Sequence, residues 1–506
     1  MEISISLVSH TNAGKTTLAR TLLGKEVGIV RDESHVTEVA ESHEMVRSAE
    51  GDVLTLWDTP GFGDSMRLAK RLAKSDSPLN WMVEQVWDRL RDRPLYSSQQ
   101  ALRNVKEHAD LVLYLVNASE DPDGAGYVAP EMSILTWTGK PVVALLNQMG
   151  PPRTREQEQQ EVDQWRERFA EYDAVKEVMA LDAFARCWVQ ERVLLGALTP
   201  LLPNDKRASY DRLFQTWLGQ RERVFDQSIQ VLTEGVARAA LDVEDLPDAG
   251  LAGRVRDLGA NLGIGRKDEN SSRDHAMVEM ARRWDLRERA DTDALISLHE
   301  LSGSAAAEVM TRVDAHYAIS EKLSEGKAAV VGGVATGALA GLKADIATGG
   351  FTLGGGMIAG SVLGALGAAG LARGYNLVRG QNQVVIQWSD QVLINKLVNA
   401  VLTYLAVTHF GRGRGDWERA EYPEHWFDIT KRCVQDRRSA FVATWKSRGV
   451  KTDLSEASLS GALNPLFRST VLVVLNELYP AAFDAADAAD PDSTSAKSAA
   501  PNTLTP

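Results

Sequence analysis

The fold is decided near the start of the chain, by residues 3–17, which read ISISLVSHTNAGKTT. Residues 3–8 alternate and then run apolar, which is typical of a short buried strand, and Leu18 to Leu23 follow as a helix. The polar residues between them contain Gly14, Lys15 and Thr16 in that order. A strand, a glycine-bearing turn and a helix in this sequence predict a loop whose backbone N–H groups surround a phosphate.

Each part of such a phosphate loop has a chemical task. Lys15 reaches the β- and γ-phosphates, and the hydroxyl of Thr16 binds Mg²⁺. The usual pattern is G-x-x-x-x-G-K-[ST], and here Ser9 stands in place of the first glycine. Since serine can adopt the extended geometry of that position, we expect a working loop with an altered turn. The residues expected to bind the nucleotide are Asn12, Ala13, Gly14, Lys15, Thr16 and Thr17.

A second motif follows the first at a suitable distance. Residues 53–57 form a predicted buried strand that ends in Asp58-Thr59-Pro60-Gly61. A carboxylate at the end of a strand can hold Mg²⁺ through water, and a glycine with a free N–H can sense a γ-phosphate. The two motifs together predict a nucleoside triphosphatase, with Asp58 as a metal residue and Gly61 as a catalytic one.

These two motifs, residues 12–18 and 58–62, resemble those of the Era/TrmE/EngA branch of translation-factor-related GTPases, over residues 1–200. The resemblance implies GTP or GDP as the ligand and Mg²⁺ as the cofactor. It also implies that Thr37, which follows Lys15 by 22 residues, closes on Mg²⁺ and the γ-phosphate; the alternative is a solvated loop residue. Lys15, Thr37 and Gly61 are then the catalytic candidates, and pairing through the GTPase domain is one further expectation.

Phe62 stands where Ras-like GTPases carry a glutamine that orients water. The phenyl ring cannot position water, so the resemblance implies that hydrolysis relies on another element, such as a potassium ion held partly by Asn12. The alternative role of Asn12 is that of a turn-forming side chain. Because no side-chain general base is evident, we expect slow intrinsic hydrolysis.

Recognition of the base is the weakest part of the pattern. Two apolar strands are predicted at residues 111–116 and 141–146, and the second ends in Asn147-Gln148-Met149-Gly150, where GTPases carry Asn-Lys-x-Asp. Asn147 is the expected base contact, but Gly150 offers no carboxylate to guanine, and this loss weakens guanine preference about tenfold or more. After a last strand at residues 175–180, Asp182 either supplies the missing carboxylate or is a helix N-cap.

The composition of the chain limits which partners, metal sites and cellular locations are expected. The chain has 506 residues, with 56 basic and 69 acidic side chains and a net charge of −13, which argues against general nucleic-acid binding. Cys187 and Cys433 are the only cysteines, so neither a disulfide framework nor a cysteine metal site is predicted. No signal peptide is recognisable at the start, and we expect a cytoplasmic location.

Beyond Pro203 the sequence predicts helices only. Residues 328–342 and 346–372 contain no charged residue and carry glycines four residues apart, the packing device of membrane helices, at positions 333, 337, 341, 356, 360 and 364. Three interpretations stay open: a hairpin that enters the inner membrane, a switchable hairpin stored inside the protein, and a tightly packed soluble pair. The expected partner through residues 328–372 is a lipid or a membrane protein. Residues 383–410 are predicted as an apolar helix that is buried in a core.

The expected architecture is an α/β P-loop NTPase domain, with a mostly parallel sheet and helices on both faces, followed by an all-α region. The expected boundaries are 1–203 for the GTPase domain, 204–325 for helices, 326–380 for the glycine-rich hairpin, 381–480 for further helices and 481–506 for a disordered tail. The whole chain resembles a bacterial family in which an Era-like GTPase domain is joined to a helical domain of unknown function.

The predicted function is that of a GTP-binding switch that hydrolyses GTP slowly and engages a membrane or protein partner according to nucleotide state. One alternative is a protein that binds nucleotide without appreciable hydrolysis. The other is a ribosome-assembly GTPase, which the acidic balance makes less attractive.

Overall fold

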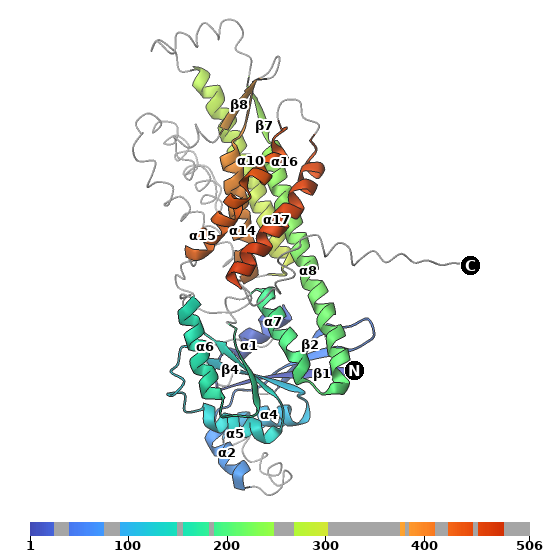
Figure 1. The fold of residues 1–506 in the computed structure, drawn as a ribbon, viewed down its shortest axis with the longest axis vertical. Coiled ribbons are helices and arrows are strands. Elements are labelled where there is room, and N and C mark those ends of the chain that lie inside the picture. The colour runs from blue at the N-terminus through green and yellow to red at the C-terminus, as the bar shows by residue number, and fades with distance from the viewer. Residues whose placement is uncertain are drawn as a thin grey trace, which may run out of the picture. The chain divides into compact units, whose positions relative to one another are not determined.

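The computed structural model describes residues 1–24, 40–74, 92–148, 155–181, 187–246, 268–301, 375–379, 384–409, 424–448 and 454–479. The chain divides into two compact units (Figure 1). Unit 1 contains Met1–Val224 with the short segments His299–Leu301 and Thr408–Glu421. Unit 2 contains Phe225–Leu298, Ser302–Val407 and Tyr422–Pro506.

A six-stranded sheet forms the centre of unit 1, in the order β2-β3-β1-β4-β5-β6. Neighbouring strands run parallel except β2, which pairs with β3 in antiparallel fashion. Since β1, β3, β4, β5 and β6 all run in the same direction, their carboxyl ends lie along one edge of the sheet. Ligands of open α/β sheets bind at this edge. The strands are β1 (Glu2–Ser9), β2 (Glu41–Arg47), β3 (Val53–Asp58), β4 (Leu111–Asn117), β5 (Val142–Asn147) and β6 (Val175–Ala180).

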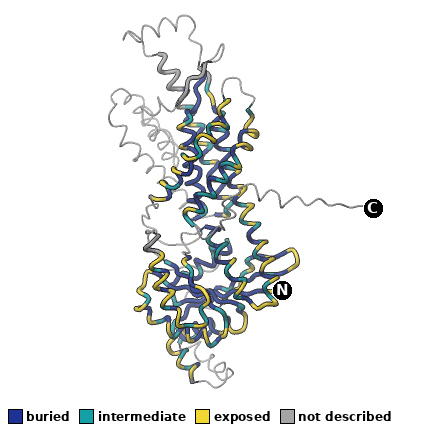
Figure 2. The backbone as a smooth tube through the Cα atoms, viewed as in Figure 1, coloured by how far each residue is buried: buried dark blue, intermediate teal, exposed yellow. Residues whose placement is uncertain are grey.

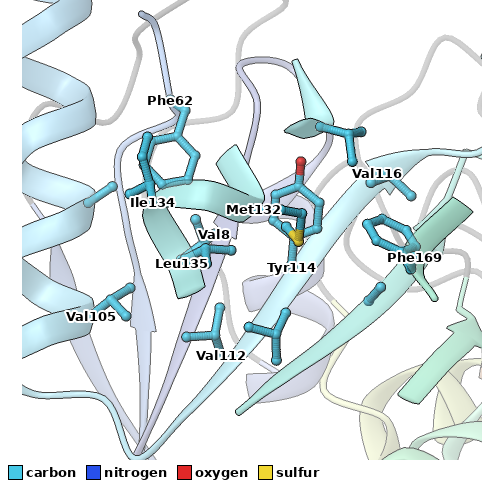
Figure 3. Close-up of a cluster of buried hydrophobic side chains, with 14 of the residues drawn as sticks. Val8, Phe62, Val105, Val112, Tyr114, Val116, Met132, Ile134, Leu135 and Phe169 are labelled. Atoms are coloured by element: carbon cyan, nitrogen blue, oxygen red, sulfur yellow. The ribbon is translucent and has the colours of Figure 1, made fainter. Parts of the chain in front are cut away.

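One face of this sheet carries a large apolar cluster (Figure 3), in which Val8, Val112 and Tyr114 from the strands pack with residues of four helices. Alternate residues of β1, such as Ile5 and Leu7, are also buried and point to the opposite face. The four inner strands β1, β3, β4 and β5 are buried over most of their length (Figure 2), as a sheet covered on both sides requires, whereas the edge strands β2 and β6 each bury a single residue. The helices of unit 1 are α1 (Lys15–Leu23), α2 (Ser65–Lys74), α4 (Arg93–Glu107), α5 (Val128–Thr138), α6 (Arg155–Phe169) and α7 (Trp188–Leu198), then the short η1 (Thr199–Leu201) and the start of α8 (Asn204–Leu241).

The predicted α/β fold is confirmed, and so are the five strands that the sequence predicts in this unit. The edge strand β2 was missed. Its sequence is ESHEMVR and only Val46 is buried, so it carries neither an apolar run nor a clean alternation.

Unit 2 is mostly helical, but the prediction that it holds no strands is wrong. A three-stranded antiparallel sheet in the order β7-β9-β8 joins β7 (Val243–Leu246), β8 (Tyr375–Arg379) and β9 (Val384–Trp388). The predicted helix over residues 383–410 therefore begins with a strand and only then becomes α14. The described helices of this unit are the end of α8, α10 (Asp268–Leu298), α14 (Asp390–His409), α15 (Glu424–Asp436), α16 (Arg438–Trp445) and α17 (Glu456–Leu478).

The core of unit 2 combines aromatic packing with buried charges. Trp284 and Trp388 meet edge to face at 4.8 Å between ring centroids. Lys396 of α14 forms an ion pair with Glu288 of α10, and its ammonium lies 4.9 Å from the Trp284 ring centroid. Asp291, one turn further along α10, accepts a hydrogen bond from Arg238 of α8 at 2.6 Å.

Two of the described helices, α14 and α17, are long and apolar enough to cross a bilayer by length and composition. In α14, 83% of the apolar window is buried inside the protein, which agrees with its prediction as a core helix, whereas in α17 the share is 44%. The glycine-rich residues 328–372 lie outside the described part of the chain, as do the tail 481–506 and residues 25–39.

Candidate nucleotide-binding site

The phosphate loop joins β1 to α1 through two residues in the left-handed backbone region. Gly14 has φ 86° and is the N-cap of α1, while Asn12 has φ 66°. Asparagine tolerates this region better than most residues, so the turn-forming role left open for Asn12 is the one that its backbone displays. A Cβ at Gly14 would lie 2.5 Å from Asn147 Nδ2, so this glycine is needed both for its φ and for the close approach of Asn147.

Lys15 crosses the loop instead of extending to solvent. Its Nζ donates to Ser9 Oγ at 2.8 Å and to the His10 carbonyl at 3.4 Å, and the residue is only 8% exposed. Burial lowers the pKa of the Lys15 ammonium, and the carboxylates of Asp58 and Glu131 raise it in opposition. The lysine therefore lies where the loop closes, within reach of an anion held by the loop.

Thr16 and Asp58, the two residues predicted from the sequence to bind a metal, are in direct contact. Thr16 Oγ1 donates to Asp58 Oδ2 at 2.7 Å, and Asp58 is 2% exposed. Burial raises the pKa of Asp58, whereas the Thr16 hydrogen bond and the Lys15 charge lower it. Among the described residues, Asp58 Oδ1 has no hydrogen-bond partner. A buried carboxylate oxygen without a protein partner, beside a threonine hydroxyl, suits the oxygen-rich shell of Mg²⁺.

Gly61 packs directly against the loop. A Cβ there would lie 3.0 Å from the Thr11 Cα and 3.2 Å from Lys15 Nζ, so any larger residue would disturb both. Phe62 N donates to the Ser9 carbonyl at 2.9 Å. The Phe62 ring is fully buried in the apolar cluster (Figure 3), so this side chain serves the core of unit 1.

Asn147, at the end of β5, is fully buried and donates from Nδ2 to the Ala13 carbonyl at 2.8 Å. Gln148 adds a long contact, 3.4 Å from its Nε2 to the Asn12 carbonyl. These bonds tie the end of β5 to the phosphate loop. Thr17 is also buried, on the first turn of α1.

The structure thus brings together Asn12 to Thr17, Asp58, Gly61 and Asn147. Three other residues discussed above, Thr37, Gly150 and Asp182, lie outside the described residues. The helix described after that last loop, α7, begins at Trp188 with Cys187 as its N-cap, so the structure gives no support to Asp182 as the cap.

One polar group beside the loop was missed by sequence reasoning. Glu131 of α5 is fully buried, and its carboxylate contacts His10 Nδ1 at 2.8 Å and the Tyr114 hydroxyl at 2.7 Å. Its signal was present, because it is the single charged residue in the sequence VAPEMSILTWT of α5. An isolated acid in an otherwise apolar helix indicates a buried partner.

Families of known proteins match both halves of the chain. Residues 4–148 match the family described as 50S ribosome-binding GTPase, and residues 173–458 match the family described as Domain of unknown function (DUF3482). The first match confirms the predicted P-loop GTPase domain, and the second confirms that it is joined to a domain of unknown function. No curated protein matches the chain.

Solved structures of GTPases are also similar, at the level of the fold. A variant of Aquifex aeolicus Era bound to GDP.AlF4- and an Era complex with MgGDPNP and nucleotides 1506–1542 of 16S ribosomal RNA are each 18% identical, with TM-scores of 0.28 and 0.29. Each alignment covers 40% of this chain and 57% of the Era chain. mGMPPNP-bound NFeoB from S. thermophilus is 17% identical, with coverage of 44% and 77% and a TM-score of 0.23.

Proposed function

This chain belongs to the family of the Domain of unknown function (DUF3482), with a P-loop GTPase domain in front of it, and we propose that it is a slow, Mg²⁺-dependent GTP hydrolase that works as a switch. The observation that carries the proposal is the closed arrangement of Lys15, Thr16, Asp58 and Gly61 around one loop. This arrangement provides a cation for the phosphates, a metal-binding pair and a glycine beside the position of the terminal phosphate.

The proposed roles follow from these positions. The backbone of residues 12–17 and the Lys15 ammonium bind the phosphates, because N–H groups at a helix start and a lysine charge both favour anions. Thr16 and Asp58 would hold Mg²⁺, with Thr37 as a further ligand, and a bound Mg²⁺ would supply positive charge to the phosphates. Asn147 orients the base side, and Asn12 remains a proposed contact for K⁺.

Slow turnover is part of the proposal, because the described site contains no side chain that acts as a general base and Phe62 is buried. Single-turnover hydrolysis of GTP, measured in potassium and then in sodium, tests it. We expect a rate well below about 1 per second without a partner, with stimulation by potassium if Asn12 contributes a ligand. A faster rate in both salts would contradict the proposal.

A second candidate is a protein that binds nucleotide without hydrolysing it. The buried Phe62 ring favours this reading, since it removes the position from which Ras-like proteins orient water. The same single-turnover experiment decides between the two, because a binder retains bound GTP through the time course.

The description of the matched GTPase family motivates a third candidate, a ribosome-associated role. The net charge of −13 weakens it, since contact with RNA is mainly a matter of positive charge. Sedimentation of the protein with 50S subunits in the presence of a GTP analogue would support this role. Co-sedimentation that disappears when the salt concentration is raised would argue against specific binding.

A further inference from the structure

Glu131 is a buried carboxylate that the proposed hydrolysis does not use. Its side chain is not exposed at all, and a buried charge is costly unless partners compensate for it. Both of its oxygens have partners: Oε2 accepts from the Tyr114 hydroxyl at 2.7 Å, and Oε1 lies 2.8 Å from His10 Nδ1. Tyr114 is itself fully buried in β4, so this carboxylate has a fixed position in the core.

His10 is the second residue of the phosphate loop, and two contacts hold its ring. Glu131 binds one edge, and Tyr127 stacks on the face with ring centroids 4.5 Å apart and planes at 19°. The backbone of the same residue lines the site, because its carbonyl accepts from Ser9 Oγ at 2.5 Å and lies 3.4 Å from Lys15 Nζ. The ring therefore fixes the peptide group that faces the lysine.

His10 fixes the first part of the loop, and this part lies beside Gly61. His10 forms a parallel bridge with Phe62, and the Thr11 Cα would be 3.0 Å from a Cβ at Gly61. The other half, residues 14–16, starts helix α1. In the proposed site, a triphosphate extends to the Gly61 side, whereas a diphosphate ends near the helix start.

We infer that Glu131 is a positioning residue for the terminal phosphate: by holding His10, it fixes the loop beside Gly61 and favours GTP over GDP. This inference rests on the proposed nucleotide site. Replacing the Glu131 carboxylate should therefore weaken the binding of a triphosphate more than the binding of a diphosphate.

The test compares the affinity of the full chain for GDP and for a non-hydrolysable GTP analogue with Mg²⁺, in wild type, Glu131→Gln and His10→Phe. The glutamine keeps the size but removes the charge, and the phenylalanine keeps the stacking on Tyr127 but removes the hydrogen bond. We expect each variant to lose about tenfold in affinity for the triphosphate, the size of one charged hydrogen bond, and less than about threefold for GDP.

Two controls separate positioning from a loss of folding. Thr138→Val removes a buried hydroxyl from the same helix, α5, and leaves both affinities unchanged. The double variant Glu131→Gln/His10→Phe loses no more than either single variant, because both changes break one link. Because the His10 side chain is 35% exposed, a phenylalanine fits there without overpacking the core, but it leaves one oxygen of the buried Glu131 carboxylate without its partner. Denaturant unfolding of both single variants therefore accompanies the titrations, and affinities are compared only at conditions where each variant is folded.

The inference would be overturned if either variant kept the wild-type ratio of GTP to GDP affinity, whether both affinities are unchanged or both fall equally. Additive losses in the double variant would overturn it as well. Failure of the wild type to bind either nucleotide would instead overturn the proposed function, and the inference with it. The wild-type titration alone therefore tells the two failures apart.

Discussion

Ser9 occupies the position where the usual phosphate loop has glycine, and its hydroxyl holds the catalytic candidate Lys15 at 2.8 Å. A bound phosphate has to take the lysine away from this hydroxyl. We expect Ser9→Ala to strengthen nucleotide binding about fivefold, because one intramolecular hydrogen bond contributes about 1 kcal/mol. Titration with a fluorescent GDP measures the change.

Ser6→Ala is the matched control for this prediction. Ser6 lies on the same strand, is fully buried and donates to Asn104 Oδ1 at 2.6 Å, away from the loop. Its removal should leave the nucleotide affinity unchanged. Weaker binding in Ser9→Ala would mean that the hydroxyl helps to place the lysine on the phosphate.

Phe62 is a core residue as much as a site residue. Because its ring is fully buried, Phe62→Gln would place an amide in the apolar cluster instead of beside water. We expect a loss of about 3 kcal/mol in the free energy of unfolding and no gain in hydrolysis. Denaturant unfolding and single-turnover rates check both parts; a stable variant that hydrolyses GTP faster would show that the side chain can reach the nucleotide.

At the scale of the element, the strands of unit 1 could be predicted because a parallel sheet covered on both faces needs near-continuous apolar runs, as in Leu111–Asn117. The edge strand β2 has no such need and could not be found. In unit 2 the apolar run Val384–Trp388 precedes the apolar helix α14 without a clear break, so a short strand was taken for the start of a helix.

The residues of the site could be predicted where a short motif sets the local geometry. They could not be predicted where the contact joins residues that are far apart in the sequence. Gly14, Lys15, Thr16 and Asp58 follow from spacing alone. Glu131 meets His10 across 121 positions of sequence and was missed; the lone acid in α5 could have indicated a buried partner, but not which one. Only the pairing of β1 with β4 and the packing of α5 supply that information.

Buried charge in unit 2 predicts a dependence of stability on pH. Burial raises the pKa of Asp291 to about 6, and Glu288 adds to the rise, whereas Lys396 and Arg238 oppose it. The folded protein therefore binds a proton at Asp291 more tightly than the unfolded chain, and this group lowers stability as pH rises from about 4 to about 6. Asp291→Asn should raise stability at pH 8, by at most about 3 kcal/mol, and have little effect at pH 4.

Thermal unfolding of the full chain at both pH values checks this prediction. Asp226→Asn is the control, because Asp226 is exposed and pairs with Arg468 at the surface of the same unit, where an ion pair contributes little. A variant Asp291→Asn that is less stable than wild type at pH 8 would show that its ion pair with Arg238 outweighs the cost of burial.

At the scale of the whole molecule, the proposed switch needs an output, and residues 328–372 remain the proposed membrane or partner contact because of their glycine spacing. We expect the full chain with a GTP analogue to float with lipid vesicles differently from the chain with GDP. Deletion of residues 328–372 should abolish flotation in both states. Equal recovery of the intact and deleted chains would remove the membrane from the account.

The central claim is that residues 1–203 bind GTP through Lys15. Binding of GTP and ATP to the full chain with Mg²⁺, in wild type and in Lys15→Ala, tests it most directly, with Lys106→Ala as a lysine control in the same unit but on α4. We predict binding of GTP in preference to ATP, a loss of at least about tenfold in Lys15→Ala and no loss in Lys106→Ala. Absence of GTP binding, or binding that survives Lys15→Ala, would contradict the account.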